Sequence, residues 1–168
     1  MGRPDWESEY VDFFVARAPA LRRTAYLMCG DWQIAEDLVQ TTFVRLYVHW
    51  RRVRQETVDA YARRILTNLF LSRRRTAHRE QVTAELPELP GGHDTPQEVG
   101  GWLELADVLS ALTDRQRAIV ALRYVDDLPV AEVAELLGIA EGTVKSHSNR
   151  ALQALRTALE AQLERPTR

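Results

Sequence analysis

The stretch LPVAEVAELLGIAEGTVKS, residues 128–146, decides the fold of the C-terminal half of the chain. It predicts two helices that cross steeply through a short turn. Such a crossing needs a small residue where the helices touch and a residue that tolerates positive φ at the turn, and Ala134 and Gly138 suit these roles. The apolar positions expected to hold the two helices together are Val133, Leu137, Ile139 and Val144. The combination predicts a helix-turn-helix.

The second helix of this pair carries polar residues on its outer face. At 100° per residue, Val144, Ala151 and Leu155 share the inner face. Arginine can bond guanine in bidentate fashion, asparagine or glutamine can do so with adenine, and basic flanks can hold phosphates. An ordinary solvated helix face is the alternative, but the filled Ala, Gly and Val positions favour DNA binding. The predicted contacts are Lys145, Ser146, Asn149, Arg150 and Gln153.

The rest of the sequence predicts an all-helical chain, because apolar residues recur at three- and four-residue spacing and strand-like alternation is scarce. Its 168 residues, 45% hydrophobic and 27% charged, have the composition of a soluble globular protein. No apolar run is long enough to span a membrane, and the N-terminus lacks the basic-then-apolar order of a signal peptide. We therefore expect a cytoplasmic protein with no membrane contact.

The sequence contains no residue pattern that would support catalysis. Cys29 is the only cysteine, which excludes an internal disulfide and a multi-cysteine zinc site, and we expect it to be a small buried hydrophobe. The four histidines are scattered without metal-ligand spacing, although His147 falls on the predicted recognition helix, where a surface position or a phosphate contact is expected. There is no P-loop and no Ser/His/Asp arrangement. We expect no enzymatic activity, no metal and no cofactor.

Helix-breaking residues divide the chain in two. Residues 84–101 contain three prolines and four glycines, which helices cannot cross easily. This predicts two small helical domains, at 5–79 and 102–165, joined by a flexible acidic linker at 80–101. The linker is interpreted either as a solvated spacer or as a mimic of nucleic acid.

Capping signals place the helices within these domains. The N-terminal domain is expected to contain a helix from residue 5 to about 30, interrupted or restarted at Pro19. A second, capped by Asp31, should run to about 51, and a third from about 57 to 75. Thr95 and Thr113 each begin a capping-box pattern, so helices are expected to start there.

The helix after Asp31 has an unusual outer face. Trp32, Ala35, Val39, Phe43, Leu46 and Trp50 form its inward stripe, which leaves two valines beside a carboxylate on the other side. Such a face indicates a protein partner, although singly exposed valines are also normal on a surface without one. The residues of this surface are Asp37, Gln40, Thr41, Val44 and Val48.

The third helix of the N-terminal half presents a basic face. Its inward positions are Ala62, Ile65, Leu66 and Leu69. The outward arginines can track phosphates, and Asn68 can hydrogen-bond a base rotated out of the stack. The alternative is a solvated helix end, where arginine also suits the helix dipole. The predicted DNA contacts are Arg63, Arg64, Thr67, Asn68, Arg74 and Arg75.

These segments together resemble the sigma-70 family of RNA polymerase sigma factors. AEDLVQTTF (35–43) is similar to the family's polymerase-binding segment, and YARRILTNL (61–69) with RRR (73–75) to its DNA-melting and minus-ten-reading segment. ALTDRQR (111–117) and GTVKS (142–146) resemble region four, which reads the minus-thirty-five element. The short linker is similar to the extracytoplasmic-function (ECF) group, and AYLMCGD (25–31) resembles its actinobacterial SigE-like members.

The resemblance implies a promoter-specificity factor without catalysis. Its implied partners are promoter DNA and core RNA polymerase, through the β′ clamp helices and the β flap, and the group is commonly held inactive by anti-sigma factors. Minus-ten bases are implied to bind in a pocket near Asn68, to which the loop at about 53–59 contributes. Two alternatives stay open. One is a LuxR-like regulator, because residues 142–147 also resemble the recognition helices of that class. The other is an adaptor that binds polymerase or an anti-sigma factor but not DNA.

Overall fold

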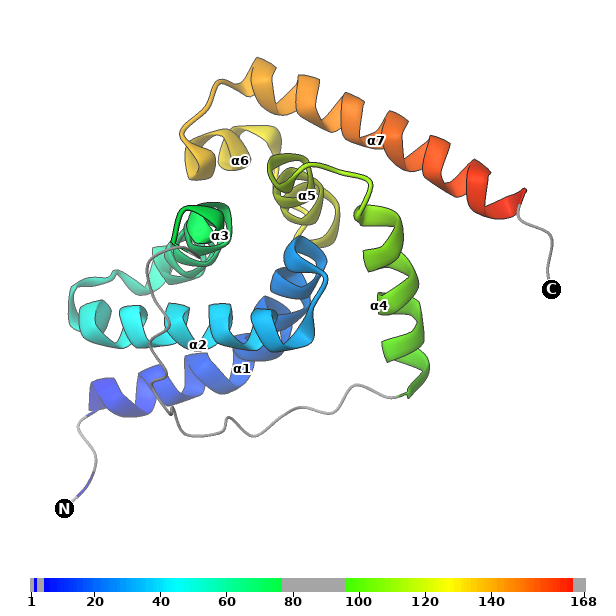
Figure 1. Ribbon diagram of the computed structural model, residues 1–168. Coiled ribbons are helices and arrows are strands. Elements are labelled where there is room, and N and C mark those ends of the chain that lie inside the picture. Colours follow the sequence, from blue (N-terminus) through cyan, green and yellow to red (C-terminus); the bar gives the residue numbers. More distant parts are fainter. Residues whose placement is uncertain (1, 3–4, 77–95, 165–168) are drawn as a thin grey trace.

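The computed structural model describes residue 2, residues 5–76 and residues 96–164, and every regular element in these ranges is helical, as predicted (Figure 1). The N-terminal unit consists of α1 (Asp5–Cys29), α2 (Trp32–His49), the short turns η1 (Trp50–Arg52) and η2 (Gln55–Thr57), and α3 (Val58–Thr76). The C-terminal unit consists of α4 (Pro96–Leu109), α5 (Asp114–Val120), the π-helical turn η3 (Ala121–Val125), α6 (Val130–Leu137) and α7 (Glu141–Leu163). Among the described helices, none combines the length and the apolar character that a bilayer crossing requires.

The predicted interruption at Pro19 is wrong, because α1 continues through it. Proline removes one backbone donor, which leaves the carbonyl of Val15 without its helical partner. Val15 is 66% exposed, so its carbonyl lies on the side of the helix open to water. Packing on both sides of the proline keeps the helix continuous: Phe14 meets Phe43, and Tyr26 stacks on Trp32.

Aromatic packing joins α1 to α2. The rings of Tyr10, Phe13 and Phe14 all contact Phe43, which is 2% exposed. The Tyr10 hydroxyl donates a hydrogen bond to the carbonyl of Phe43 at 2.9 Å, and burial, with a smaller contribution from Tyr47, raises the pKa of Tyr10 to about 12. The inward stripe predicted for α2 is confirmed: Ala35, Val39, Phe43, Leu46 and Trp50 are buried, and Trp32 is half-buried.

The predicted helix starts are also confirmed. The Asp31 carboxylate accepts hydrogen bonds from the backbone N–H groups of Gln33 (2.8 Å) and Ile34 (3.1 Å). Thr113 and Gln116 form a reciprocal capping box at the start of α5. Helix α4 begins at Pro96, so residues 96–101 of the expected linker are helical. Residues 77–95, with most of the predicted acidic linker, lie outside the described residues.

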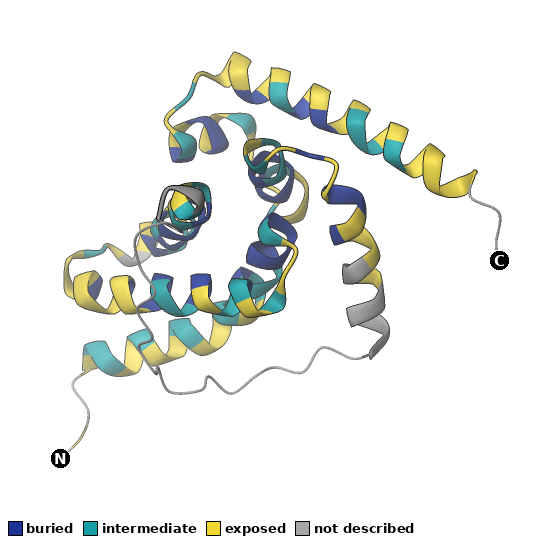
Figure 2. Cartoon of the chain, in the orientation of Figure 1, coloured by how far each residue is buried: buried dark blue, intermediate teal, exposed yellow. Residues whose placement is uncertain are grey.

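The two units pack against each other, which the sequence does not predict. One hydrophobic cluster runs from Leu66 and Phe70 in the N-terminal unit to Leu109, Ile119 and Leu122 in the C-terminal unit. Helix α1 contacts α4, α5 and η3, and α3 contacts α5 and α6. Buried residues gather where α1, α3 and α5 approach one another (Figure 2). The predicted DNA-contacting faces of α3 and α7 are thereby held in one compact body.

Candidate nucleic-acid and polymerase interfaces

The turn between α6 and α7 has the geometry predicted for a helix-turn-helix. Gly138 ends α6 in the left-handed conformation, with φ of 65°. A residue with a Cβ adopts that conformation only at a cost, so glycine suits this position. The N–H of Ile139 donates to the carbonyl of Ala134 at 3.0 Å, and Val133 and Val144 are fully buried between the helices.

Helix α7 turns its predicted reading face to solvent. Val144 and Ala151 are buried, whereas the proposed contacts are all exposed: Lys145, Ser146, Asn149, Arg150 and Gln153. His147 is half-buried rather than on the surface, and its Nδ1 is enclosed without a hydrogen-bond partner among the described residues. The exposed set therefore offers both base-reading and phosphate-binding groups along one face of the helix.

Helix α3 exposes part of its predicted face and buries another part. Arg64 and Asn68 are exposed, as predicted. Thr67 was expected to point outward, but it is completely buried, and this prediction is wrong. The reason is that α3 packs against both units: it contacts α1 and α2 of the N-terminal unit and also α5 and α6 of the C-terminal unit. Sequence periodicity locates one inward face, and it cannot show a second unit covering the adjacent flank.

The burial of Thr67 leads to a stability prediction. Its hydroxyl makes no hydrogen bond within the described residues, and an unsatisfied buried polar group is destabilising. The Thr67→Val variant should therefore keep its free energy of unfolding or gain up to about 2 kcal/mol, measured by urea denaturation. A loss of stability on that scale would mean that the hydroxyl is bonded. Promoter opening should be unaffected, because Thr67 does not reach the surface.

A basic pocket of about 510 Å³ lies between α3 and the turns that precede it. This volume is within the range of small-molecule binding sites. The lining residues from the N-terminal unit are His49, Arg52, Val53, Arg54, Thr57, Ala60, Tyr61 and Arg64. One residue from the C-terminal unit, Glu135 of α6, also lines it. The side chains of Arg74 and Arg75, which complete the predicted set on α3, lie outside the described side chains.

The outer face of α2 exposes the predicted apolar patch. Val44 is 48% exposed and Val48 72% exposed, with Asp37 exposed beside them. Gln40 and Thr41 are half-buried at the edge.

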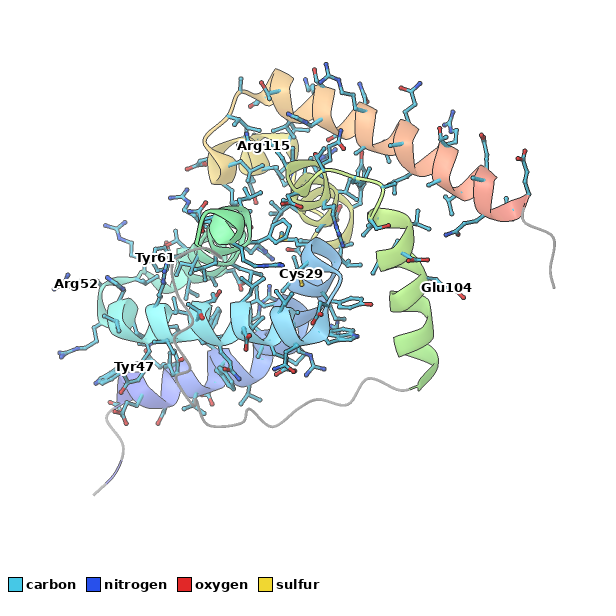
Figure 3. All side chains as sticks on the ribbon, viewed as in Figure 1. Cys29, Tyr47, Arg52, Tyr61, Glu104 and Arg115 are labelled. Carbon is cyan, nitrogen blue, oxygen red and sulfur yellow. The ribbon has the colours of Figure 1, made fainter. Side chains whose placement is uncertain are left out.

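Sequence reasoning missed one residue at this edge, Tyr47, which is 44% exposed. Its ring contacts Trp6 and Tyr10, with centroids 5.5 and 5.1 Å apart, and Figure 3 shows it near the N-terminal end of α1. Its position seven residues after Gln40, about two helical turns, is the signal that could have identified it.

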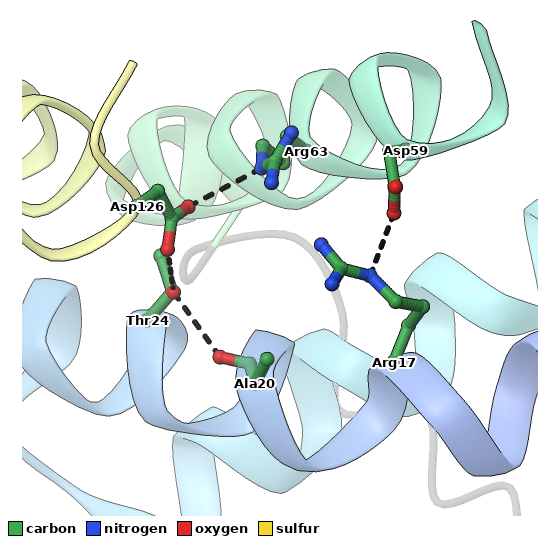
Figure 4. A network of polar contacts seen from close by, with 6 residues as sticks. All are labelled: Arg17, Ala20, Thr24, Asp59, Arg63 and Asp126. Carbon is green, nitrogen blue, oxygen red and sulfur yellow. Dashed lines mark hydrogen bonds and ion pairs between the residues drawn. The ribbon is translucent and has the colours of Figure 1, made fainter. Parts of the chain in front are cut away.

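A polar network ties the two units together at Asp126, in the turn between η3 and α6 (Figure 4). The Asp126 Oδ1 accepts a hydrogen bond from the Thr24 hydroxyl at 2.7 Å, and that hydroxyl also lies 3.1 Å from the carbonyl of Ala20. The Asp126 Oδ2 forms an ion pair with the Nε of Arg63 at 3.4 Å, without hydrogen-bond geometry. Burial raises the pKa of Asp126, and the Thr24 hydrogen bond and the Arg63 charge oppose that rise.

A second polar contact between the units lies at the end of α1. The Arg117 guanidinium of α5 donates two hydrogen bonds to the carbonyl of Leu27, from Nε at 3.2 Å and from Nη2 at 3.0 Å. A Cβ on Gly30 would come within 3.2 Å of that guanidinium, and Gly30 has a φ of +74°. Cys29, labelled in Figure 3, is half-buried, and burial raises the pKa of its thiol. The described residues contain no group of His, Cys, Asp and Glu side chains able to hold a metal ion.

Comparison with known proteins gives matches over most of the chain. The family model "Sigma-70 region 2" matches residues 13–80, and "Sigma-70, region 4" matches residues 102–155. The chain is 37% identical over 155 residues to the RNA polymerase sigma-E factor of Streptomyces coelicolor, covering 91% of this chain and 87% of that protein. It is 34% identical over 154 residues to the ECF RNA polymerase sigma factor SigL of Mycobacterium tuberculosis, covering 85% of this chain and 84% of that one.

A solved structure shares the fold. It is the sigma factor RpoE of Bartonella quintana, crystallised in complex with the anti-sigma factor NepR. The TM-score is 0.70 with 24% sequence identity, and the match covers 94% of this chain and 99% of that one.

Proposed function

Because the chain belongs to the sigma-70 family of RNA polymerase sigma factors, we propose that separate surfaces on α2, α3 and α7 divide the work of transcription initiation among them. Sigma factors bind core RNA polymerase and direct it to promoters, and they are not enzymes. The alternatives of a LuxR-like regulator and of an adaptor without DNA binding are therefore not favoured. One observation supports the division of labour: each of these helices buries its apolar stripe and exposes a chemically distinct face.

The α2 surface is assigned to polymerase. It comprises Asp37, Gln40, Thr41, Val44 and Val48, and we add Tyr47 to it. Exposed aliphatic and aromatic groups beside one carboxylate have the composition of a protein interface core with a polar rim. The proposed partner is the pair of clamp helices of the β′ subunit, and the β flap is assigned to the C-terminal unit.

The α3 surface is assigned to the melted minus-ten strand. Arg64 lines the basic pocket and is exposed, so it can meet phosphates, and Asn68 lies one turn further along the same face. Tyr61 and the arginines of the preceding turns offer stacking and charge to an unpaired base. Arg63, Arg74 and Arg75 are proposed as further phosphate contacts. Opening would then be driven by binding energy.

The α7 surface is assigned to duplex DNA at the minus-thirty-five element, where Arg150 and Asn149 would read base edges and Lys145 would hold a phosphate. We further propose the division into region two at 5–79, a linker at 80–101 and region four at 102–165. A cytoplasmic location and regulation by an anti-sigma factor complete the proposal.

Transcription in vitro tests the proposal as a whole. The purified full chain, mixed with core RNA polymerase and a genomic promoter library, should start transcripts at defined sites that share minus-thirty-five and minus-ten sequences. The same mixture without the chain should not select those sites. If the chain selects no start site from the whole library, the assignment of the three surfaces is wrong.

Two substitutions on α3 should separate base reading from phosphate binding. Asn68→Ala should reduce binding of a labelled minus-ten strand to the holoenzyme by about 0.5–1.5 kcal/mol, the usual worth of a hydrogen bond, and only for the preferred sequence. Arg64→Ala should weaken binding to all sequences and lower the salt-dependence slope by about 0.7 per phosphate contact. Fluorescence anisotropy in a salt titration measures both quantities.

Arg115→Ala is the matched control, since Arg115 is an exposed arginine of α5 outside this surface. It should bind the minus-ten strand as the unmodified chain does. If Asn68→Ala lowers binding equally for every sequence, Asn68 contacts only the backbone.

A further inference from the structure

We propose that an ion pair between Arg17 of α1 and Asp59 of α3 positions the wall of the basic pocket, and thereby sets how well the chain distinguishes minus-ten bases. This role rests on the proposed function of the pocket in holding an unpaired base, and it adds two residues that act without touching DNA. The distance from the Arg17 Nε to the Asp59 Oδ1 is 2.7 Å. Figure 4 shows Arg17 reaching from α1 to Asp59 at the start of α3. We call these two residues the anchor pair.

Much of the wall of the basic pocket belongs to the loop that joins α2 to α3 and contains η1 and η2. This loop supplies four of the lining residues: Arg52, Val53, Arg54 and Thr57. Ala60 and Tyr61, which directly follow Asp59 on α3, line the pocket as well. The shape of the pocket therefore depends on where this loop and the first turn of α3 lie relative to the rest of the N-terminal unit.

The loop has hollows on two sides. Val53, near its middle, lines both the basic pocket of about 510 Å³ and a second hollow of about 500 Å³, which Trp6 and Glu9 of α1 also line. A segment between two hollows makes fewer packing contacts along its length than a close-packed one. Local hydrogen bonds shape its turns, such as the bond from the N–H of Thr57 to the carbonyl of Arg54 at 3.0 Å. Such bonds fix the shape of a turn but not its position relative to α1.

The position of the loop is set at its two ends, and both ends are held by α1. At the first end, Trp50 is 7% exposed, and its ring centroid lies 5.3 Å from that of Tyr10 and 5.5 Å from that of Phe13. At the second end, Asp59 pairs with Arg17. Phe13 and Arg17 are four residues apart, about one helical turn, so one stretch of α1 holds both ends. Aromatic packing fixes the first end, and the anchor pair fixes the second.

The exposure of the anchor pair bounds its effect. The side chains of Arg17 and Asp59 are 33% and 48% exposed, so substitutions there should leave the fold intact. An ion pair at this exposure is partly screened by solvent and shifts a conformational equilibrium by up to about fivefold. Its loss should let the loop leave the position that fits the preferred base in a larger share of molecules. The alternative, an ion pair that only stabilises the fold, predicts that its loss weakens binding of every strand equally.

The first experiment compares Arg17→Gln with Arg22→Gln in the full chain bound to core RNA polymerase. Arg22 is the matched control, because it is also an arginine of α1 in an ion pair with a carboxylate of another helix, Glu36 of α2 at 3.1 Å. Fluorescence anisotropy measures the ratio of two affinities: for the preferred minus-ten strand, and for a strand changed at the base whose recognition Asn68→Ala removes. Arg17→Gln should lower this ratio about two- to fivefold, and Arg22→Gln should leave it unchanged.

Charge reversal tests whether the two residues act as a pair. Asp59→Arg alone should lower the ratio, and the double variant Arg17→Asp/Asp59→Arg should restore it, because opposite charges again face each other. A charge that acts only on phosphates cancels in the ratio, since both strands have the same backbone. The proposal is overturned if the double variant discriminates no better than Asp59→Arg alone, or if Arg17→Gln leaves the ratio unchanged. An equal loss in Arg22→Gln would overturn it as well.

The second experiment follows the loop itself, without DNA or polymerase. In the free chain, amide hydrogen exchange over residues 50–57, measured by mass spectrometry, should be up to about fivefold faster in Arg17→Gln than in Arg22→Gln. Equal exchange in the two variants would contradict the positioning role. If the unmodified chain shows no base preference with core polymerase, the proposed function is wrong instead, and exchange over the loop still decides whether the anchor pair positions it.

Discussion

Replacing both Val44 and Val48 with aspartate is expected to lower the affinity of the chain for core RNA polymerase by at least about a hundredfold. Both side chains are exposed in the free chain, at 48% and 72%, so the substitution does not disturb the core. If the surface docks on a protein partner, each new carboxylate is buried without a counter-charge. An unpaired charge in an interface costs several kcal/mol, and each 1.4 kcal/mol corresponds to about tenfold in affinity.

Val15→Asp is the matched control for this double substitution. Val15 is 66% exposed on α1 and lies outside the proposed surface. Affinity for core polymerase, measured by fluorescence titration of labelled chain, should be unchanged in the control. Urea denaturation should give equal free energies of unfolding for all variants to within about 1 kcal/mol, as expected for surface substitutions. Unchanged polymerase affinity in the double variant would remove α2 from the interface.

Arg150→Ala is expected to cost about 1–3 kcal/mol of binding at promoters with an intact minus-thirty-five element, the usual worth of a bidentate base contact. The arginine is exposed on α7, so its guanidinium is accessible to DNA. The loss should disappear when the element is scrambled, because the contact that is removed is specific to its sequence. Holoenzyme binding to the two duplexes measures the difference.

Arg156→Ala serves as the comparison on the same helix. Arg156 is also exposed, at the flank of the reading face, where a phosphate contact is expected. Its removal should weaken binding equally on both duplexes and lower the salt-dependence slope by about 0.9. If Arg150→Ala behaves in the same way as Arg156→Ala, Arg150 is a phosphate anchor and does not read sequence.

The sequence by itself determined the local structure and the faces of the isolated helices. The Asp31 cap, the Thr113 capping box and the left-handed Gly138 follow from residues a few positions apart, and all three are confirmed. The exposure of Arg150 and Val48 follows from helical periodicity, which depends only on spacing along one helix. These features involve short-range contacts, which a single sequence specifies directly.

Only the tertiary structure decided how the two units meet. The uninterrupted helix at Pro19, the burial of Thr67 and the pairing of Arg63 with Asp126 all depend on which surface packs against α1 and α3. That choice joins residues of different elements, such as Phe14 with Phe43 and Arg63 with Asp126, and the periodicity of one helix does not record it. The physical reason is that a helix has room for more than one buried flank. The sequence pattern identifies the apolar flank. The other flank is covered by contacts that involve an arginine, a threonine and a carboxylate, and such polar residues lead the pattern to predict exposure to solvent.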